Sequence, residues 1–369
     1  MPPPSFHFSS YMPSRLSSVG SFVFKPVLPC EIEDENFSLP LNKVARLYST
    51  PVRIFKSACK LLSLPLATMI NKSVQMGVYP AKLKYAKIIP VHKTDDIANP
   101  TNYRPISLLS IFNRIFEKII CNRLQVFLEK HEILYHSQYG FRKNCSTEHA
   151  FIDNVSKIQS NIDKKLHSCG VFIDLKKAFD KVDYSILLSK LEHYGIRGII
   201  NSWFSSYLTN RYQTTQVGRH ISNKELCRCG VPQGSVLGPL LFLIYINDVY
   251  LSSDKFYFYL FADDTNLLYT NKNLKLLEEI VNVELSKVSN WLLANKLTLN
   301  VKKSNFVIFH RRQRSIDYNI KIYIFDNNLN CNVPLERKNY VKYLGVLIDF
   351  KLTWQDHITY ISSLKLAKH

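Results

Sequence analysis

Three carboxylates stand beside apolar segments of this chain, where an unpaired acid would be costly to bury. Asp174 follows the apolar run VFI, and Asp263 and Asp264 form the centre of LFADDTNLL. Each signal alone has an ordinary explanation, because a lone Asp often caps a helix and an Asp-Asp pair often only makes a turn. Together they offer the hard oxygen ligands that suit Mg²⁺. Two such ions, about 3.5–4 Å apart, are a known arrangement for nucleotidyl transfer.

A glycine-bracketed segment, CGVPQGSVLGPLL, lies between these acids in the sequence. Gly230 and Gly234 flank Pro232 and Gln233. Glycine lets a backbone approach a ligand closely. We therefore expect the Gln233 side-chain amide to line a nucleotide pocket.

The elements that must position these residues are visible as apolar patterns. Residues 256–269 predict two strands around a tight turn with acids at its tip, and residues 169–175 predict a short buried strand. Apolar residues at spacings of three and four predict helices over 106–132 and 273–293. Strands and helices alternate without a βαβ glycine fingerprint. The fold class is therefore α+β, with an antiparallel sheet covered by helices.

Shorter patterns predict the remaining elements. They are short helices within 42–83, a strand over 84–93, a turn and helix after 138, a helix over 185–196, and strands within 296–310 and 340–350. The apolar run Val236 to Ile246 is 11 residues long and contains Gly and Pro. A membrane-spanning helix needs about 20 residues, so we interpret the run as a buried element and expect no membrane partner.

Composition limits the class of partner. Lys and Arg number 48 against 29 for Asp and Glu, a net charge of +19 that suits a polyanion such as nucleic acid. The eight cysteines form no Cys-x-x-Cys pair, so a zinc finger has no support. With no secretory leader evident, we expect reduced thiols and a location in the nucleus or the cytoplasm rather than secretion.

The motifs occur in an order that resembles the reverse transcriptases of non-LTR, LINE-like retrotransposons. The matching segments are NYRPISLL (102–109), QYGFR (138–142), FIDLKKAFDKVD (172–183), GVPQGSVLGPLLF (230–242), FADDT (261–265), LTLNVKKS (297–304) and YLGV (343–346). The segment KLTWQDHI (351–358) also resembles the one that follows YLGV in that family. The resemblance covers roughly residues 60–369, and seven motifs in order are far more specific than FADD alone.

This resemblance implies a catalytic metal site. Asp174, Asp263 and Asp264 match the catalytic carboxylates of the family, with the Leu175 carbonyl as an extra metal ligand. The expected cofactor is a pair of Mg²⁺ ions, for which Mn²⁺ is a substitute.

The resemblance also implies five nucleotide-binding residues. Lys93 and Arg104 match the cations that hold the triphosphate, and Gln233 matches the residue that packs by the nucleotide. Phe179 matches the residue under the incoming sugar, and Lys303 matches a general acid toward pyrophosphate, although the neighbouring Lys302 leaves that register open. The simpler alternatives are solvated loop charges for the two cations and an ordinary core aromatic for Phe179.

Tyr343, Leu344 and Gly345 match the hairpin that grips the primer end. The implied architecture is a right-hand polymerase with palm and fingers over 85–348 and the start of a truncated thumb over 349–369. Residues 1–40 are expected to form a poorly defined leader and residues 41–84 a helical N-terminal extension. The endonuclease domain of a full element is expected to be missing.

The expected activity is RNA-directed DNA polymerisation, with an RNA template, a DNA primer and dNTPs as partners. One alternative is a catalytically inactive or domesticated nucleic-acid-binding remnant. Another is an RNA-dependent RNA polymerase, which is disfavoured because Phe179 would crowd a 2′-hydroxyl and because Ala262 stands where such enzymes usually carry Gly.

Overall fold

The computed structural model describes residues 7–12, 20–37, 52–93, 96–311, 319–326 and 329–366. The chain divides into two compact units, each built from separate stretches of sequence. The first unit comprises residues 1–13, 135–178 and 246–369, and the second comprises residues 14–134 and 179–245. Both contain helices and sheet, which confirms the predicted α+β class.

A five-stranded sheet in the order β12-β9-β3-β8-β7 is the centre of the first unit. Its strands are β3 (His167–Ile173), β7 (Tyr257–Phe261), β8 (Asp264–Asn271), β9 (Asn305–Phe309) and β12 (Glu336–Arg337). β3 pairs antiparallel with both β8 and β9, and β7 pairs antiparallel with β8. The short β12 joins β9 in parallel, so the prediction of a purely antiparallel sheet was wrong at this edge.

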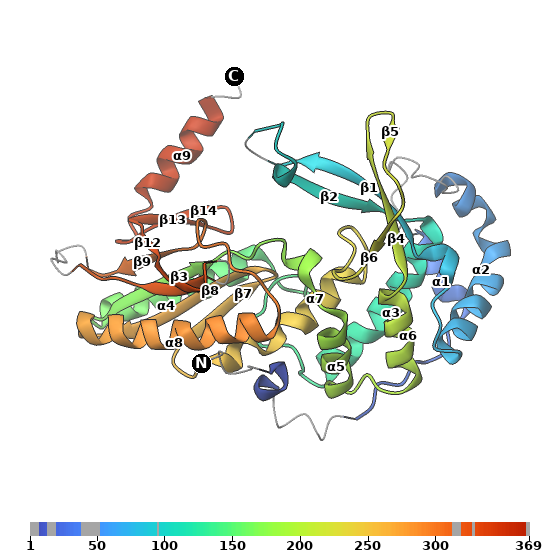
Figure 1. The fold of residues 1–369 in the computed structure, drawn as a ribbon, viewed down its shortest axis with the longest axis horizontal. Coiled ribbons are helices and arrows are strands. Elements are labelled where there is room, and N and C mark those ends of the chain that lie inside the picture. The colour runs from blue at the N-terminus through green and yellow to red at the C-terminus, as the bar shows by residue number, and fades with distance from the viewer. Residues whose placement is uncertain are drawn as a thin grey trace. The chain divides into compact units, whose positions relative to one another are not determined.

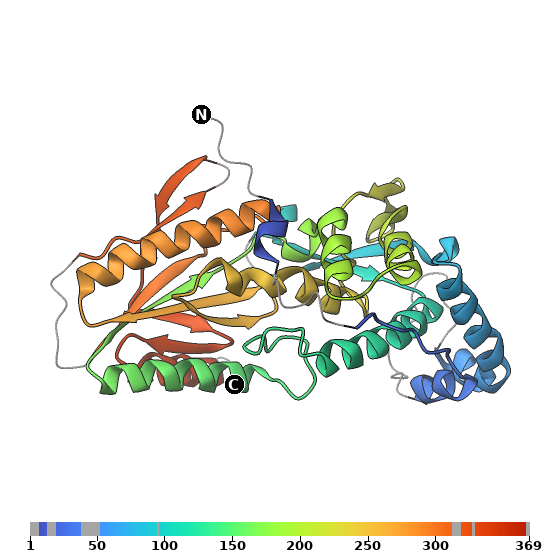
Figure 2. The same cartoon turned by 90° about the horizontal axis from the view of Figure 1, so that it is seen from below.

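Two helices cover opposite faces of this sheet, α4 (Thr147–Asp163) on one side and α8 (Leu274–Ala294) on the other (Figure 2). Every residue of β3 is buried, as expected for a strand that is covered on both faces. On the α4 face, Phe172 lies in a core cluster with Ile158 and Leu268. The first unit also contains η1 (Phe8–Tyr11), η6 (Asn247–Ser252), β10 (Tyr323–Asp326), β11 (Cys331–Pro334), β13 (Tyr340–Tyr343), β14 (Val346–Asp349) and α9 (Gln355–Leu366).

The second unit combines a group of helices with another five-stranded sheet, of order β2-β1-β4-β5 with β6 also paired to β4. The β1–β2 hairpin and β5 extend away from the helices (Figure 1). The strands are β1 (Tyr85–His92), β2 (Tyr103–Leu108), β4 (Arg211–Val217), β5 (His220–Ile221) and β6 (Glu225–Cys227). The helices are α1 (Pro29–Phe37), α2 (Val52–Gln75), α3 (Ile111–Lys130), α5 (Tyr184–His193), α6 (Ile199–Leu208) and α7 (Gly238–Ile246). The 3₁₀ turns are η3 (Ala81–Leu83), η4 (Pro100–Asn102) and η5 (Ala178–Lys181). The first residue of η5, Ala178, and the last residue of α7, Ile246, belong to the first unit. Because β1 and β4 run parallel, this sheet is mixed.

Most of the predicted elements are confirmed, and three need correction. The predicted helix over 106–132 begins only at Ile111, because Ser110 caps it and accepts a hydrogen bond from the Asn113 N–H at 3.2 Å. The preceding residues 106–108 pair with β1 instead. In place of several short helices, α2 is one helix of 24 residues that contains Pro65, while residues 42–51 lie outside the described part. The segment 297–301 forms an isolated bridge rather than a strand.

Helix α7 is the apolar run predicted to be a buried element, and that prediction is confirmed. Its residues from Leu240 to Ile246 are at most 2% exposed. Across the described residues, we find no helix with the length and apolar character needed to cross a membrane.

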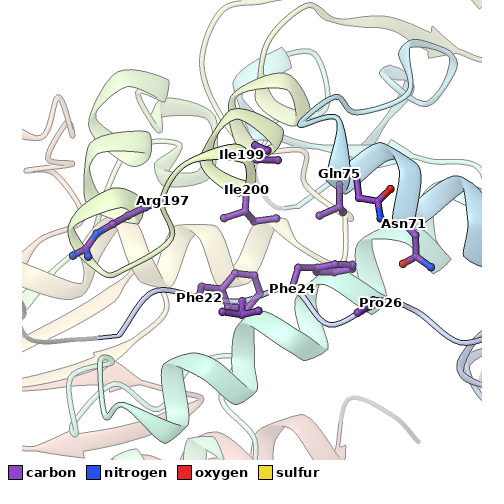
Figure 3. A pocket seen from close by; sticks show the side chains of 10 residues that line it. Phe22, Phe24, Pro26, Asn71, Gln75, Arg197, Ile199 and Ile200 are labelled. Carbon is purple, nitrogen blue, oxygen red and sulfur yellow. The ribbon is translucent and has the colours of Figure 1, made fainter.

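A pocket of about 310 Å³ lies within the second unit (Figure 3). Phe22 and Phe24 of an extended segment line it together with Asn71 of α2 and Ile200 of α6. Asn71 fixes that segment, since its side chain accepts the Val27 N–H at 2.7 Å and donates to the Val27 carbonyl at 3.0 Å. None of the predicted site residues lines this pocket.

Candidate active site

The acidic hairpin of the first unit has a two-residue loop. Phe261 at the end of β7 pairs with Asp264 at the start of β8, so Ala262 and Asp263 form the turn. Ala262 has a φ of 55°, a left-handed conformation at the first loop position that matches the twist of a tight hairpin. Asp263 is half-buried at the tip, and Asp264 is exposed as the first strand residue. The predicted hairpin with acids at its tip is confirmed.

Asp174 lies directly after β3, beside this hairpin. The β3–β8 register ends with Ile173 opposite Thr265, and one further step puts Asp174 across from Asp264. Opposite residues of an antiparallel pair have Cβ atoms about 4.5–5.5 Å apart on one face of the sheet, and like charges there repel. A bound cation would remove that repulsion. The sheet thus brings together two of the predicted carboxylates, with the third in the adjoining turn.

Three hydrogen bonds fix Asp174 from the segment 300–304. Its N–H donates to Ser304 Oγ at 3.1 Å, and its carbonyl accepts the Asn300 N–H at 2.8 Å. Asn300 Nδ2 also donates to the Asp174 carboxylate at 2.6 Å. Sequence reasoning missed Asn300 and Ser304, although both are polar residues within the LTLNVKKS motif.

Two further predicted site residues, Leu175 and Lys303, are neighbours of Asp174 and of Ser304 in the chain. Leu175 lies opposite Leu299 in an isolated antiparallel bridge. The hydrogen bonds of this bridge join Lys176 to Thr298 and Asn300 to Asp174, so the Leu175 carbonyl points away from Leu299. The Leu175 side chain is buried. Lys303 is exposed, and its N–H donates to the Asn300 carbonyl at 3.0 Å.

The donor chemistry of this site suits a hard divalent cation, because carboxylates dominate it. Within the described part of the chain, no three His, Cys, Asp or Glu side chains are gathered closely enough to form a finished metal cluster. The Asp174 carboxylate is engaged by the Asn300 amide. This contact occupies only Oδ2, so a cation at Asp174 would bind through the other carboxylate oxygen while the Asn300 hydrogen bond is kept.

The predicted primer-gripping hairpin is β13–β14, with Leu344 and Gly345 as its two loop residues. Their φ angles of 48° and 93° suit a tight hairpin turn with two left-handed residues. The Tyr343 ring lies in the core, 5.7 Å from the Phe172 ring, and only 4% of the residue is exposed. Burial, and then the charge of Asp264, raise the pKa of the Tyr343 phenol. The turn, rather than the Tyr343 side chain, therefore faces solvent.

In the second unit, the loop around Gln233 is locked to the segment of Phe179. The Val231 N–H donates to the Phe179 carbonyl at 2.9 Å, and Gln233 Nε2 donates to Asp180 Oδ1 at 2.8 Å. Gly230, with a φ of 86°, lies so close that an added Cβ would be 2.8 Å from the Asp180 carbonyl oxygen. The glycine is therefore required by packing as well as by conformation.

The half-buried Phe179 ring stacks on Phe242 of α7, with ring centroids 4.5 Å apart at 25°. This contact supports one face of the ring, as a rigid aromatic wall requires. It also fits the alternative that Phe179 is a core aromatic, because packing on one side is common to both.

Lys93 and Arg104 lie at the open end of the β1–β2 pair. Arg104 stands opposite Val91, and the Lys93 N–H donates to the Asn102 carbonyl at 3.0 Å. Both side chains are exposed. The hairpin thus places the two predicted phosphate-binding cations near each other.

A buried carboxylate that sequence reasoning missed holds the Gln233 loop. Glu117 of α3 is 0% exposed and accepts the Val236 N–H at 2.7 Å. It also accepts hydrogen bonds from Tyr207 OH at 2.7 Å and Asn113 Nδ2 at 2.9 Å. Burial, and then the Glu117 charge, raise the pKa of the Tyr207 phenol, which remains a donor. The only hint in the sequence is an acid on the apolar face of a predicted helix.

The carboxylates across β3 and β8 and the ordered motifs define a class of protein. Residues 91–348, well over half of the chain, match the family described as Reverse transcriptase (RNA-dependent DNA polymerase). The chain therefore belongs to the reverse transcriptase family, which uses divalent metals in general.

Three of its relatives come from transposable elements of Drosophila melanogaster. The chain is 30% identical to the probable RNA-directed DNA polymerase from transposon BS and 29% identical to that from transposon X-element. It is also 29% identical to the RNA-directed DNA polymerase from mobile element jockey. The alignments cover 92%, 93% and 80% of this chain but only 37%, 38% and 32% of those relatives. The resemblance to non-LTR retrotransposon reverse transcriptases is confirmed, and the chain spans less than two fifths of each relative.

Proposed function

We propose that this chain is an RNA-directed DNA polymerase of a non-LTR retrotransposon, which joins dNTPs to the 3′-hydroxyl of a DNA primer on an RNA template. The observation that carries the proposal is that Asp174 and Asp264 are the next residues beyond the last pair of the β3–β8 ladder, with Asp263 in the adjoining turn. Membership of the reverse transcriptase family supports it. The net charge of +19 suits nucleic-acid partners. We place its action inside the cell, in the nucleus or the cytoplasm.

The finer architecture is part of this proposal. We assign residues 85–348 to the fingers and palm of a right-hand polymerase and residues 349–369 to the beginning of a thumb. We assign residues 41–84 to an N-terminal extension that includes α2. Of the expected leader over 1–40, residues 20–37 pack into the second unit, with Phe22, Val27 and Ile32 buried. The relatives are much longer than this chain, and we expect the full element to include an endonuclease domain.

Asp174, Asp263 and Asp264 are the proposed ligands of two Mg²⁺ ions, or of Mn²⁺ in their place, with the Leu175 carbonyl as an additional ligand. Bound divalent ions supply acidification of the attacking hydroxyl and stabilisation of the leaving pyrophosphate. Asn300 holds the Asp174 carboxylate in place through one of its two oxygens. Ser304 fixes the Asp174 backbone, so the carboxylate does not need to reorganise far.

The remaining site residues bind the nucleotide and the primer. We propose that Lys93 and Arg104 pair with the triphosphate, since Arg suits bidentate phosphate contacts. Gln233 lies beside the nucleotide, where Asp180 holds its amide, and Phe179 lies beneath the sugar. Lys303 donates a proton to pyrophosphate. The backbone of the turn after Tyr343, at Leu344 and Gly345, grips the primer end.

Primer extension on an RNA template with dNTPs and Mg²⁺ tests the activity. Asp174→Asn and Asp263→Asn are each expected to lower the rate by several orders of magnitude and to leave the unfolding midpoint unchanged, because each removes a metal ligand without removing packing. Asp254→Asn, at an exposed position outside the proposed site, serves as the matched control. Near-normal extension by either Asp variant would contradict the proposed metal-ion mechanism. Template–primer binding without any extension by the unaltered chain would instead support an inactive nucleic-acid-binding protein.

A further inference from the structure

One buried side chain links the QYGF segment to the acidic turn within the first unit. Gln138 is 2% exposed, and its Oε1 accepts two backbone N–H groups. One is the Gly140 N–H at 2.8 Å, and the other is the Ala262 N–H at 3.1 Å. A single carboxamide oxygen therefore connects the loop after β7 to a segment more than 100 residues earlier in the chain.

The backbone around this contact fits closely. The Tyr139 N–H donates to the Leu260 carbonyl at 2.8 Å, and the Leu260 N–H donates to the Ser137 carbonyl at 2.9 Å. A Cβ added to Gly140 would lie 2.3 Å from the Ala262 nitrogen. Any side chain at position 140 would push the turn away, so the close approach depends on glycine.

In this turn, Ala262 has a backbone conformation that alanine rarely adopts. Ala262 has a φ of 55°, and left-handed backbone costs a non-glycine residue roughly 1–2 kcal/mol. Such a conformation persists when its surroundings fix it. The Gln138 oxygen supplies that restraint, because it binds the N–H of the left-handed residue itself.

The Nε2 atom of Gln138 shows that packing alone does not explain why glutamine occupies this position. Because Oε1 accepts two N–H groups, the amide orientation is decided and Nε2 is the donor end. Among the described residues, buried Nε2 has no hydrogen-bond partner. A buried donor without a partner costs about 1–3 kcal/mol, which an apolar side chain of the same size would avoid. The two hydrogen bonds accepted by Oε1 therefore have to offset the cost of the unpartnered Nε2.

We infer that Gln138 is a positioning residue that sets the conformation of the Ala262–Asp263 turn and thereby the placement of the Asp263 and Asp264 carboxylates for metal binding. This inference rests on the proposed function, in which those carboxylates hold the metal. Gln138 does not touch substrate or metal. It acts through the backbone of the turn.

The test is Mn²⁺ binding to the full chain without nucleic acid, measured by electron paramagnetic resonance. Gln138→Leu keeps the size of the side chain and removes the acceptor, and we expect it to weaken Mn²⁺ binding about tenfold. Gly140→Ala disturbs the same contact from the opposite side and should act in the same direction. Tyr139→Phe is the control, because it removes only the hydrogen bond to Asp153 in the same segment. It should leave Mn²⁺ binding unchanged.

Primer extension supplies a second readout. Misplaced carboxylates should lower kcat about tenfold while KM for dNTP stays within about twofold, and raised metal concentration should restore part of the rate. A purely structural role would instead lower the unfolding midpoint and leave the Mn²⁺ affinity of the folded fraction unchanged. Unchanged affinity in both Gln138→Leu and Gly140→Ala, with affinity lost in Asp263→Asn, would overturn this inference alone. Unchanged affinity in Asp263→Asn would overturn the proposed metal site and the inference together.

Discussion

Two loops of this protein are each held by a buried side-chain oxygen that accepts backbone N–H groups, but one oxygen belongs to a neutral amide and the other to a carboxylate. In the first unit, the neutral Gln138 oxygen accepts the backbone N–H groups of Gly140 and Ala262 at the acidic turn. In the second unit, the carboxylate of Glu117 accepts the Val236 N–H of the Gln233 loop, together with Tyr207 and Asn113 side chains. Both anchors are buried and reach their loops from distant parts of the sequence.

The difference follows from the surroundings of each loop. A negative anchor beside Asp263 and Asp264 would add to their repulsion, so a neutral acceptor is the better choice there. Glu117 is surrounded by donors, and the positive charge of buried Arg211 interacts with it. Hydrogen bonds to an ionised acceptor are roughly twice as strong as neutral ones. A loop can therefore be held more tightly by a carboxylate, provided that no other acid lies next to it.

Removing the charged anchor should have the largest effect on stability. Glu117→Ala leaves three donors without their acceptor, and each such loss costs about 1–3 kcal/mol, so the free energy of unfolding should fall by about 3 kcal/mol or more. Glu117→Gln retains one acceptor oxygen and should cost only part of this. Chemical denaturation of the two variants gives the comparison. Equal stabilities for the two would show that the hydrogen bonds of Glu117 contribute little.

The next effect concerns sugar choice in the region that Glu117 helps to hold. If Phe179 lies beneath the nucleotide sugar, a ribose 2′-hydroxyl meets a clash and an unpaired polar group, a penalty of roughly 1–3 kcal/mol. Phe179→Val should therefore raise ribonucleotide use relative to deoxyribonucleotide by at least about tenfold. The measurement is the ratio of kcat/KM for the two sugars.

Phe242→Leu is the matched control for this experiment. It keeps the Phe179 ring and removes only the ring stacked behind it, so its effect on the ratio should be smaller. If Phe179→Val lowers both rates equally and leaves the ratio unchanged, Phe179 is a core residue and leaves the proposed site.

A third anchor gives the smallest effect and tests the role of charge. Asp349 accepts N–H groups from Lys351, Thr353 and Trp354 at 2.7–3.0 Å, in a turn where Leu352 and Trp354 are left-handed. Burial raises the pKa of this carboxyl, but the hydrogen bonds outweigh it and lower the pKa on balance. By analogy with helix caps, Asp349→Ala should cost about 1 kcal/mol at pH 7.

The sign of the pH dependence follows from the lowered pKa. The folded protein binds the Asp349 proton more weakly than the unfolded chain, so the stabilisation is present above the unfolded pKa of about 3.9 and is lost as the pH falls through the folded value. The stability difference between the unaltered chain and Asp349→Ala should therefore shrink below about pH 4. Gln138→Leu, which removes a neutral anchor, should show no such change. A constant Asp349→Ala difference down to pH 2 would contradict this assignment.

Local patterns predicted the elements near the site well. The alternation around FADD and the apolar run before Asp174 gave β7, β8 and β3, and the three- and four-residue spacings gave α8. The same spacings misplaced the start of α3, because Ile106 and its neighbours suit a helix face equally well. Their strand conformation depends on pairing with β1, which is a tertiary choice.

The anchors could not be predicted from one sequence. Gln138 and Ala262, like Glu117 and Val236, are more than 100 residues apart, and no local pattern links them. Tyr343 shows the opposite case. The alternation in YVKY already points its side chain inward, as Val341 and Tyr343 are both buried, so the Tyr343 ring is not available to a ligand.

The chain order of the first unit has a consequence for its synthesis. β3 is complete at Ile173, but its partners β8 and β9 begin only at Asp264 and Asn305, after the whole of residues 179–245 has been made. At about 5–20 residues per second, the ribosome takes roughly 5–30 s to supply both partners. During that time an apolar strand with two unpaired edges has no sheet to join, and such strands readily pair with other chains. Helix α4 directly precedes β3 in the chain and packs against it, so early docking of α4 would cover one face of the strand during that interval.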